Sequence, residues 1–165
     1  METLSNFSFQ DWVPNQKTVL CFVFEQEAVL LIEKKRGLGA GKVNGPGGKI
    51  DPGETSLQAT IRECQEEIGI TPLNPEPCGE LCFQFADGLA QHCEVFRSEK
   101  AQGQLMETDE AKAFWQPVSE IPYHRMWQDD EFWFPHLIER RYFKGYFTFD
   151  GDRMLSRKVV IHDAG

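Results

Sequence analysis

Residues 45–70 read GPGGKIDPGETSLQATIRECQEEIGI, and the character of the sequence changes halfway along this segment. The first part is rich in glycine, which permits tight turns and a close approach of the backbone to a ligand. The second part is typical of a helix that begins near Thr55 or Ser56 and ends at Gly69, a residue type favoured after a helix C-terminus. Spacings of three and four between apolar residues indicate one stripe facing a core: Leu57, Ile61, Cys64 and Ile68.

Three glutamates, Glu63, Glu66 and Glu67, are expected on the side of this helix away from the apolar stripe. Glu63 and Glu67 are four residues apart, a spacing at which like charges mildly destabilise a helix. One interpretation is a solvated charged face, as in most charged runs. The other is a magnesium site, because hard divalent cations take oxygen ligands from carboxylates and loop carbonyls. The spacing of the surrounding residues favours the second interpretation.

That spacing resembles the motif of the Nudix family, Gly-x5-Glu-x7-Arg-Glu-U-x-Glu-Glu-x-Gly-U, where U is bulky and apolar. All the fixed residues are present: Gly48, Glu54, Arg62, Glu63, Glu66, Glu67 and Gly69. Cys64 is a small occupant of a U position. The resemblance implies a Nudix α/β/α sandwich, with a mixed β-sheet between helices. It also implies an enzyme that hydrolyses a nucleoside diphosphate linked to another group.

The resemblance assigns roles to the residues of the motif. It implies that Mg²⁺, with Mn²⁺ as an alternative, binds oxygen atoms of Gly47 (or Gly48), Glu63, Glu66 and Glu67. Such a metal offsets charge on phosphate oxygens and lowers the pKa of a bound water that attacks phosphorus. Glu63 or Glu66 is expected to be the general base. Gly48, Glu54 and Arg62 are expected to be structural, with an Arg62–Glu54 ion pair tying the loop to the helix.

Over residues 17–161 the chain is similar to the MutT-homologue branch of the family, through KKRGLGAGKVNG at 34–45 and MWQDDEFWFP at 126–135. That branch hydrolyses oxidised purine nucleoside triphosphates, such as 8-oxo-dGTP and 2-oxo-dATP, to the monophosphate and pyrophosphate. The resemblance implies that the base is held by an asparagine, a tryptophan and two adjacent aspartates, which match Asn44, Trp127, Asp129 and Asp130.

The physical chemistry of these four side chains suits that role. Trp127 offers a flat face for stacking, and the amide of Asn44 offers a donor and an acceptor side by side. Two neighbouring carboxyls in a pocket cannot both ionise cheaply, so one can stay protonated and donate to a base. Alternatives are open: Trp127 is compatible with a core position, and Asp129 or Asp130 with the N-cap of the next helix.

Further substrate contacts are expected from a strand and from a basic cluster. Phe83 and Phe85 share one face of a strand and match pocket-lining aromatics of the branch, although without that match they would be read as core. Lys34 belongs to a cluster, residues 34–36, that is either solvated or placed to contact phosphate. The four histidines have no ligand spacing and receive no role.

Several positions depart from the branch, where base specificity is expected to be decided. They are Leu38 for phenylalanine, Val43 for tryptophan, Pro46 for an aromatic residue, Gln91 for methionine and Val19 for a threonine on the first strand. Pocket contacts of this size discriminate by ~1–3 kcal/mol. An alternative is therefore a Nudix pyrophosphohydrolase that prefers unmodified dGTP, another purine triphosphate or another nucleoside diphosphate derivative.

The composition sets the remaining expectations. A length of 165 residues, with 41% hydrophobic and 26% charged, suits an N-terminal arm over 1–16 and a single domain over 17–165. A net charge of −9 argues against nucleic-acid polymers as partners, and so against a 5′-RNA pyrophosphohydrolase. The intact glutamates argue against a catalytically inactive nucleotide-binding sensor. The partner is expected to be a purine nucleoside triphosphate.

Localisation is expected to be cytoplasmic. Five cysteines, an odd number without a Cys-x-x-Cys pair, resemble small buried hydrophobes in a reducing compartment. No apolar run reaches the length of a membrane span and no signal peptide is evident, so no membrane is expected. We expect a monomer.

Hydrophobic patterning predicts the other elements of the mixed sheet. Strands are expected at 19–24, 28–32, 81–85, 94–96, 113–116, 146–149 and 158–161, with turns at Asp87-Gly88 and Asp150-Gly151. A second helix is expected over 131–142, bent near Pro135, and a surface loop over 99–110.

Overall fold

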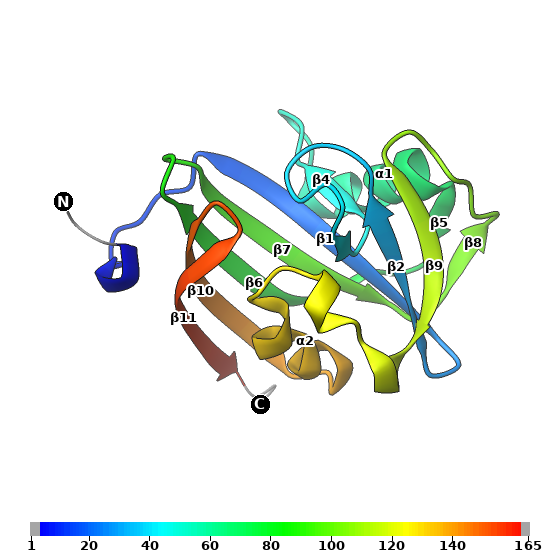
Figure 1. The fold of residues 1–165 in the computed structure, drawn as a ribbon. Coiled ribbons are helices and arrows are strands. Elements are labelled where there is room, and N and C mark those ends of the chain that lie inside the picture. The colour runs from blue at the N-terminus through cyan, green and yellow to red at the C-terminus, as the bar shows by residue number, and fades with distance from the viewer. Residues whose placement is uncertain (1–3, 163–165) are drawn as a thin grey trace.

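The computed structural model describes residues 4–162, which form a mixed nine-stranded sheet with one α-helix on each face (Figure 1). The strand order is β11-β10-β6-β7-β1-β2-β3, with β4 pairing with β1 and β9 with β2. The strands are β1 (Gln16–Glu25), β2 (Ala28–Lys34), β3 (Val43–Asn44), β4 (Gly47–Lys49), β6 (Glu76–Phe85), β7 (Ala90–Ser98), β9 (Ala111–Pro117), β10 (Tyr142–Asp150) and β11 (Arg153–His162). The β1–β7 and β6–β10 pairs are parallel and the others antiparallel.

Helix α1 spans Ser56–Ile68, which confirms the boundaries predicted from its caps. Thr55 is the N-cap, and a reciprocal capping box joins it to Gln58. Gly69 follows the helix in the left-handed conformation with a φ of 80°, where glycine is unstrained. Local sequence therefore sets both ends of this helix.

Two hydrophobic cores lie on the two faces of the sheet, because successive residues of β1 point to opposite sides. Cys21 and Val23 pack in the core that includes Cys64 and Ile68 of α1. Phe22 packs in the other core, which includes Trp133, Phe134 and Leu137 of α2 (Asp130–Ile138). This arrangement confirms the predicted α/β/α sandwich with a mixed sheet.

The predicted faces of α1 need correction. Leu57, assigned to the apolar stripe, is 44% exposed, while Ala59 and Thr60 are fully buried. Glu67, assigned to the solvent side, is only 3% exposed because the loop containing Gly47 folds over it. The buried face is therefore rotated relative to the one predicted from apolar residues alone.

Two other predicted segments differ from the structure. The second helix ends at Ile138 instead of residue 142, because Tyr142 opens β10, which pairs with β6. Pro135 lies inside this helix. Residues 99–110 are not entirely loop, since β8 (Ala101–Gly103) pairs with β5 (Ile70–Pro72). The other predicted strands are confirmed, most of them with longer bounds.

Among residues 4–162, three short 3-10 helices complete the fold: η1 (Leu4–Asn6), η2 (Val118–Glu120) and η3 (Tyr123–Arg125). The free cysteines Cys21, Cys64, Cys82 and Cys93 are buried and Cys78 is half-buried, as expected for small hydrophobic side chains. Within residues 4–162, no helix is long and apolar enough to cross a membrane.

Candidate active site

A cavity of about 670 Å³ is lined by residues of the sheet, of α1 and of α2, and its volume is within the usual range for small-molecule sites. It brings together most of the side chains that the sequence nominated. They are Lys34, Asn44, Gly47, Gly48, Glu63, Glu67, Phe83, Phe85, Trp127, Asp129 and Asp130. Glu54, Arg62 and Glu66 do not line it.

Glu63 and Glu67 form the carboxylate end of the cavity. The Gly47 N–H donates to Glu67 Oε2 at 3.0 Å. Burial raises the pKa of Glu67 to about 7, opposed by that hydrogen bond. Burial also raises the pKa of Glu63, and the adjacent Arg62 guanidinium opposes that shift. A Cβ at Gly48 would lie 2.6 Å from the Glu63 carboxyl carbon, so only glycine fits there without displacing that side chain.

Glu66 lies apart from these two carboxylates. Its side chain is 63% exposed, and its Oε2 accepts a hydrogen bond from Arg62 Nη1 at 3.2 Å. Among residues 4–162, no group of three or more His, Cys, Asp or Glu is arranged to hold a metal ion. The structure thus gathers Glu63, Glu67 and the Gly47 backbone, but not the complete predicted ligand set.

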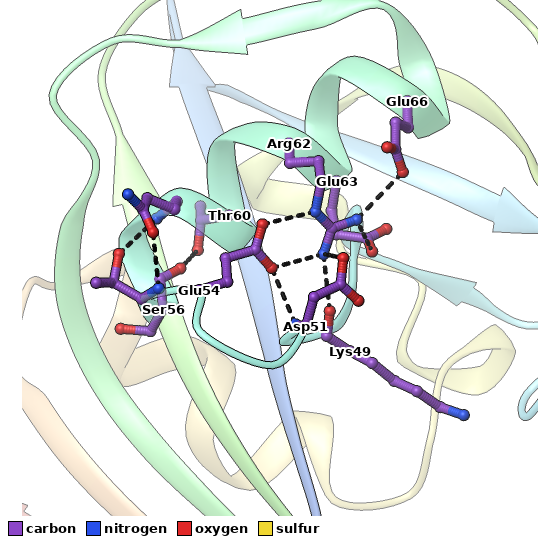
Figure 2. A network of polar contacts seen from close by, with 10 residues as sticks. Lys49, Asp51, Glu54, Ser56, Thr60, Arg62, Glu63 and Glu66 are labelled. Carbon is purple, nitrogen blue, oxygen red and sulfur yellow. Dashed lines mark hydrogen bonds and ion pairs between the residues drawn. The ribbon is translucent and has the colours of Figure 1, made fainter.

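Arg62 ties the glycine-rich loop to α1 (Figure 2). Its Nε and Nη2 donate to the two oxygens of Glu54 at 2.7 and 2.8 Å, the ion pair expected from the sequence. Nη2 also donates to the Lys49 carbonyl at 2.9 Å, and Nη1 to Glu63 Oε1 at 2.8 Å. The hydrogen bond from Arg62, followed by that from the Asp51 N–H, lowers the pKa of Glu54 to about 2. Arg62 therefore fixes the loop and orients a cavity carboxylate at once.

In the basic cluster before the loop, Lys34 and Arg36 line the cavity, and Lys35 and Arg36 make ion pairs. Lys35 pairs with Glu107 at 2.6 Å, and Arg36 pairs with Glu110 at 3.0 Å. Lys34 lines the cavity, and its positive charge opposes the rise in the pKa of Glu67. Lys34 therefore contributes positive charge to the same cavity as the Glu67 carboxyl.

Asp129 and Asp130 form a buried acid pair at another part of the cavity wall. The indole N–H of Trp133 donates to Asp129 Oδ2 at 2.7 Å. Asp129 Oδ1 and Asp130 Oδ2 are buried without a hydrogen-bond partner among the described residues. Burial raises the pKa of Asp129 to about 6 and that of Asp130 well above its usual range, with Asp129 adding to the second shift. Both carboxyls of the pair therefore bind a proton more readily than an isolated aspartate does.

The N-cap interpretation of this pair holds for the position of Asp129 but not for a capping hydrogen bond. Asp129 occupies the N-cap position of α2, but its side chain makes no capping hydrogen bond. Its carboxylate instead accepts from Trp133, one turn along the helix. Because buried polar atoms are normally satisfied, the free oxygens of the pair mark a place for a polar ligand.

Trp127 is held edge-on by the aromatic wall. Its ring centroid lies 6.0 Å from that of Phe85 and 5.4 Å from that of Phe149, at near-perpendicular angles. Lys42 Nζ lies 5.4 Å from the ring. The indole is half-buried and lines the cavity, which leaves it able to stack on a planar ligand. Asn44 Oδ1 accepts from the Gly45 N–H at 2.8 Å, so its amide NH₂ is the group available to a ligand.

Some of the positions that depart from the MutT-homologue branch line the cavity, and others do not. Leu38, Gln91 and Val19 line the cavity, whereas Val43 is fully buried in the core and Pro46 is buried outside the cavity wall. Sequence reasoning missed several lining residues: Gln16, Thr18, Leu20, Leu89, Cys93 and Trp133. The alternation of β1 places Thr18 on the same face as Leu20 and was the signal that could have found it.

This fold, with a carboxylate-lined cavity beside a glycine-rich loop, has the form of a Nudix hydrolase. The family model described as NUDIX domain matches residues 14–137, so the chain belongs to the Nudix family. The chain is therefore an enzyme of the Nudix hydrolase class. Enzymes of this class generally need a divalent metal ion. The oxygen atoms of Glu63, Glu67 and Gly47 fit that requirement chemically.

Relatives with assigned names are similar over most of the chain. The oxidized purine nucleoside triphosphate hydrolase of Danio rerio is 41% identical over 133 residues, which is 80% of this chain and 85% of the relative. The protein of the same name from Mus musculus is 36% identical over 139 residues, covering 83% and 89%. A crystal structure of a MutT protein from Bacillus halodurans superposes with a TM-score of 0.79 at 30% identity, covering 87% of this chain and 97% of that one.

Proposed function

We propose that this enzyme hydrolyses oxidised purine nucleoside triphosphates, such as 8-oxo-dGTP and 2-oxo-dATP, to the monophosphate and pyrophosphate, and so sanitises the nucleotide pool. The observation that carries the proposal is the buried acid pair Asp129–Asp130, with free oxygens, in the same cavity as the Glu63 and Glu67 carboxylates. The names of the zebrafish and mouse relatives support the same substrate class.

The acid pair and Trp127 would recognise the base. With one proton, the pair offers an O–H donor beside a carboxylate acceptor, which complements a purine edge carrying an acceptor beside an N–H. Trp127 would stack on the plane of the base, and the Asn44 NH₂ would donate to a second edge. Phe83 and Phe85 line the same cavity and would give the base an apolar surface to pack against. Recognition would then depend on hydrogen-bond pattern as well as on shape.

At the other end, Glu63, Glu66 and Glu67 with the Gly47 carbonyl would hold Mg²⁺ (or Mn²⁺). The ion supplies charge neutralisation on the phosphate oxygens and lowers the pKa of a water molecule. Lys34 would donate to a phosphate oxygen, and Glu63 or Glu66 would accept the proton of the attacking water. Glu66 takes part only if its carboxylate leaves Arg62, a contact that is exposed and therefore weak.

One substrate panel tests the proposal: kcat/KM for pyrophosphate release from 8-oxo-dGTP, 2-oxo-dATP, dGTP, dATP and dCTP with Mg²⁺. Preference for the oxidised purines supports it. Equal rates for all five, or a preference for dCTP, would overturn the assigned substrate class.

A matched pair of variants tests the chemistry at the carboxylate end. Glu66→Gln should lower kcat by roughly two orders of magnitude or more with an unchanged Tm, as expected for loss of a general base or a metal ligand. Glu139→Gln is the control, because Glu139 is similarly exposed and also has an arginine partner. If the Glu66 variant keeps the wild-type kcat, its catalytic assignment is wrong.

The second candidate function is preference for unmodified dGTP or another nucleoside diphosphate derivative, and one observation favours it. The amide of Gln91 lines the cavity and donates to Gln16 Oε1 at 2.6 Å, so this part of the wall is polar. A polar wall suits a substrate with an additional hydrogen-bonding group there. The same panel separates the two candidates. We further propose that the protein acts as a monomer in the cytoplasm, where its free thiols remain reduced.

A further inference from the structure

The N-terminal arm, residues 4–15, passes behind the aromatic wall of the cavity. Phe9 contacts Tyr146 of β10 with a centroid distance of 5.3 Å, and the Trp12 indole N–H donates to Gln84 Oε1 of β6 at 2.9 Å. Strand alternation puts Gln84 on the sheet face opposite Phe85, which lines the cavity. The arm therefore supports from behind the strands that carry the cavity wall, and η1 lies beside β10 and β11 (Figure 1).

Asn15, the last residue of the arm, forms hydrogen bonds to the β6–β7 turn on both sides of Leu89. Asn15 N–H donates to the Ala90 carbonyl at 2.8 Å, and the Ala90 N–H donates to Asn15 Oδ1 at 2.9 Å. Asn15 Nδ2 donates to the Gly88 carbonyl at 3.0 Å. Leu89, between Gly88 and Ala90, lines the cavity. Three hydrogen bonds from one residue thus fix the backbone that presents Leu89.

Gln84 extends the same support toward the cavity. Its Nε2 donates to the Phe85 carbonyl at 3.1 Å and approaches the Leu89 carbonyl at 3.5 Å, while its Oε1 accepts from Trp12. The Phe85 N–H donates to the same Leu89 carbonyl at 2.9 Å. Trp12 and Asn15 therefore converge on one short turn that carries two cavity-lining side chains.

We propose that Trp12 and Asn15 are positioning residues for the base end of the cavity, and that the arm sets affinity for the nucleoside without taking part in the phosphate chemistry. This inference rests on the proposed function, because it takes the wall at Phe85 and Leu89 to contact a purine nucleoside. The match to the family model begins at residue 14, so Trp12 lies outside the matched part of the chain.

The test compares Asn15→Ala and Trp12→Phe with wild type. Trp12→Phe keeps an aromatic ring beside Phe9 and removes the N–H donor together with the second ring of the indole. Gln10→Ala is the matched control, since Gln10 is an exposed residue of the same arm. KM for 8-oxo-dGTP should rise roughly three- to tenfold in the two variants, the scale of one or two net hydrogen bonds, with kcat within about twofold of wild type.

Hydrogen exchange provides a readout that does not depend on the substrate. The amides of residues 86–90 should exchange faster in Asn15→Ala than in wild type or in Gln10→Ala, because they lose their bracing. A wild-type KM in both variants, or a fall in kcat that matches the rise in KM, would overturn the positioning role. If the wild-type enzyme releases no pyrophosphate from any nucleotide, the proposed function fails on its own. Unchanged exchange in residues 86–90 would still refute the bracing.

Discussion

Replacing Trp133 with phenylalanine should move the pH at which the buried acid pair takes up a second proton. Trp133 is fully buried, its ring stacks on Phe143 with a centroid distance of 5.3 Å, and its N–H donates to Asp129 Oδ2 at 2.7 Å. Phenylalanine keeps an aromatic ring at the stack and removes the donor. The substitution removes the one hydrogen bond that Trp133 donates to this carboxylate, together with the buried volume of the second indole ring.

The size of the shift follows from the strength of that bond. A hydrogen bond to a charged group contributes about 1.5–3 kcal/mol, and 1.36 kcal/mol corresponds to one pKa unit, so the shift should be about one to two units. The bond stabilises the ionised form of Asp129, whose pKa is about 6 in the intact pair. Loss of this hydrogen bond raises the pKa of Asp129, so the pair becomes doubly protonated at a higher pH. Once doubly protonated, the pair no longer offers a carboxylate as hydrogen-bond acceptor.

The assay is the dissociation constant of the nucleoside 8-oxo-deoxyguanosine, measured calorimetrically from about pH 5 to about pH 9 without metal. Leaving out the phosphates keeps the carboxylates Glu63 and Glu67 out of the measurement. Wild-type affinity should fall as the pH drops through about 6, and the midpoint should lie higher in Trp133→Phe. Asp129→Asn is the control, because it removes the titrating group. A midpoint that is the same in Trp133→Phe and wild type would refute the reasoning.

Three further predictions concern stability and the glycine loop. Arg62→Ala should lower the unfolding free energy by about 2 kcal/mol and Tm by about 4–8 °C, since Arg62 makes a bidentate pair with Glu54. Thermal denaturation checks this prediction, and a change in Tm below about 1 °C contradicts it. Asp130→Asn should raise Tm more at about pH 8 than at about pH 5. The folded pKa of Asp130 is raised, so the acid destabilises the fold increasingly as pH rises above the unfolded value, and equal effects at both pH values would contradict this. Gly48→Ala should lower kcat by about tenfold or more by displacing Glu63, and wild-type kcat with wild-type Tm would show that the cavity tolerates a Cβ.

The parts of the fold that local chemistry controls were predictable from the sequence. The capping residue Thr55 and the left-handed Gly69 set the ends of α1 in the structure as they do in the sequence. The aromatic alternation of β10 and the Asp150-Gly151 turn likewise indicated the hairpin to β11. These signals depend on residues within a few positions of one another, so no tertiary information is needed.

The parts that depend on distant packing were not predictable in the same way. Glu67 is polar, and its burial follows from the Gly47 loop folding over α1, which helical periodicity does not encode. The partner of Asp129 is Trp133, and nothing in the local sequence favours that contact over a capping hydrogen bond. Alternation along β1 indicates which residues share a face with Thr18, but the place of β1 beside β7, which brings that face to the cavity, is set by long-range pairing.

Burial raises the pKa of carboxyl groups at both ends of the cavity, but the groups that oppose the rise differ between the two ends. At the end formed by Glu63 and Glu67, Arg62 donates to Glu63, and the charge of Lys34 acts on Glu67, so nearby cations oppose the effect of burial on both pKa values. At the other end, Asp129 and Asp130 are adjacent and as deeply buried as Glu67, and the donor to Asp129 is the neutral indole N–H of Trp133. Burial raises both pKa values there, and the neighbouring Asp129 carboxyl adds to the rise for Asp130. The groups that oppose the effect of burial therefore differ between the two ends: cations act on Glu63 and Glu67, whereas Asp129 has a neutral N–H donor and a second carboxyl beside it.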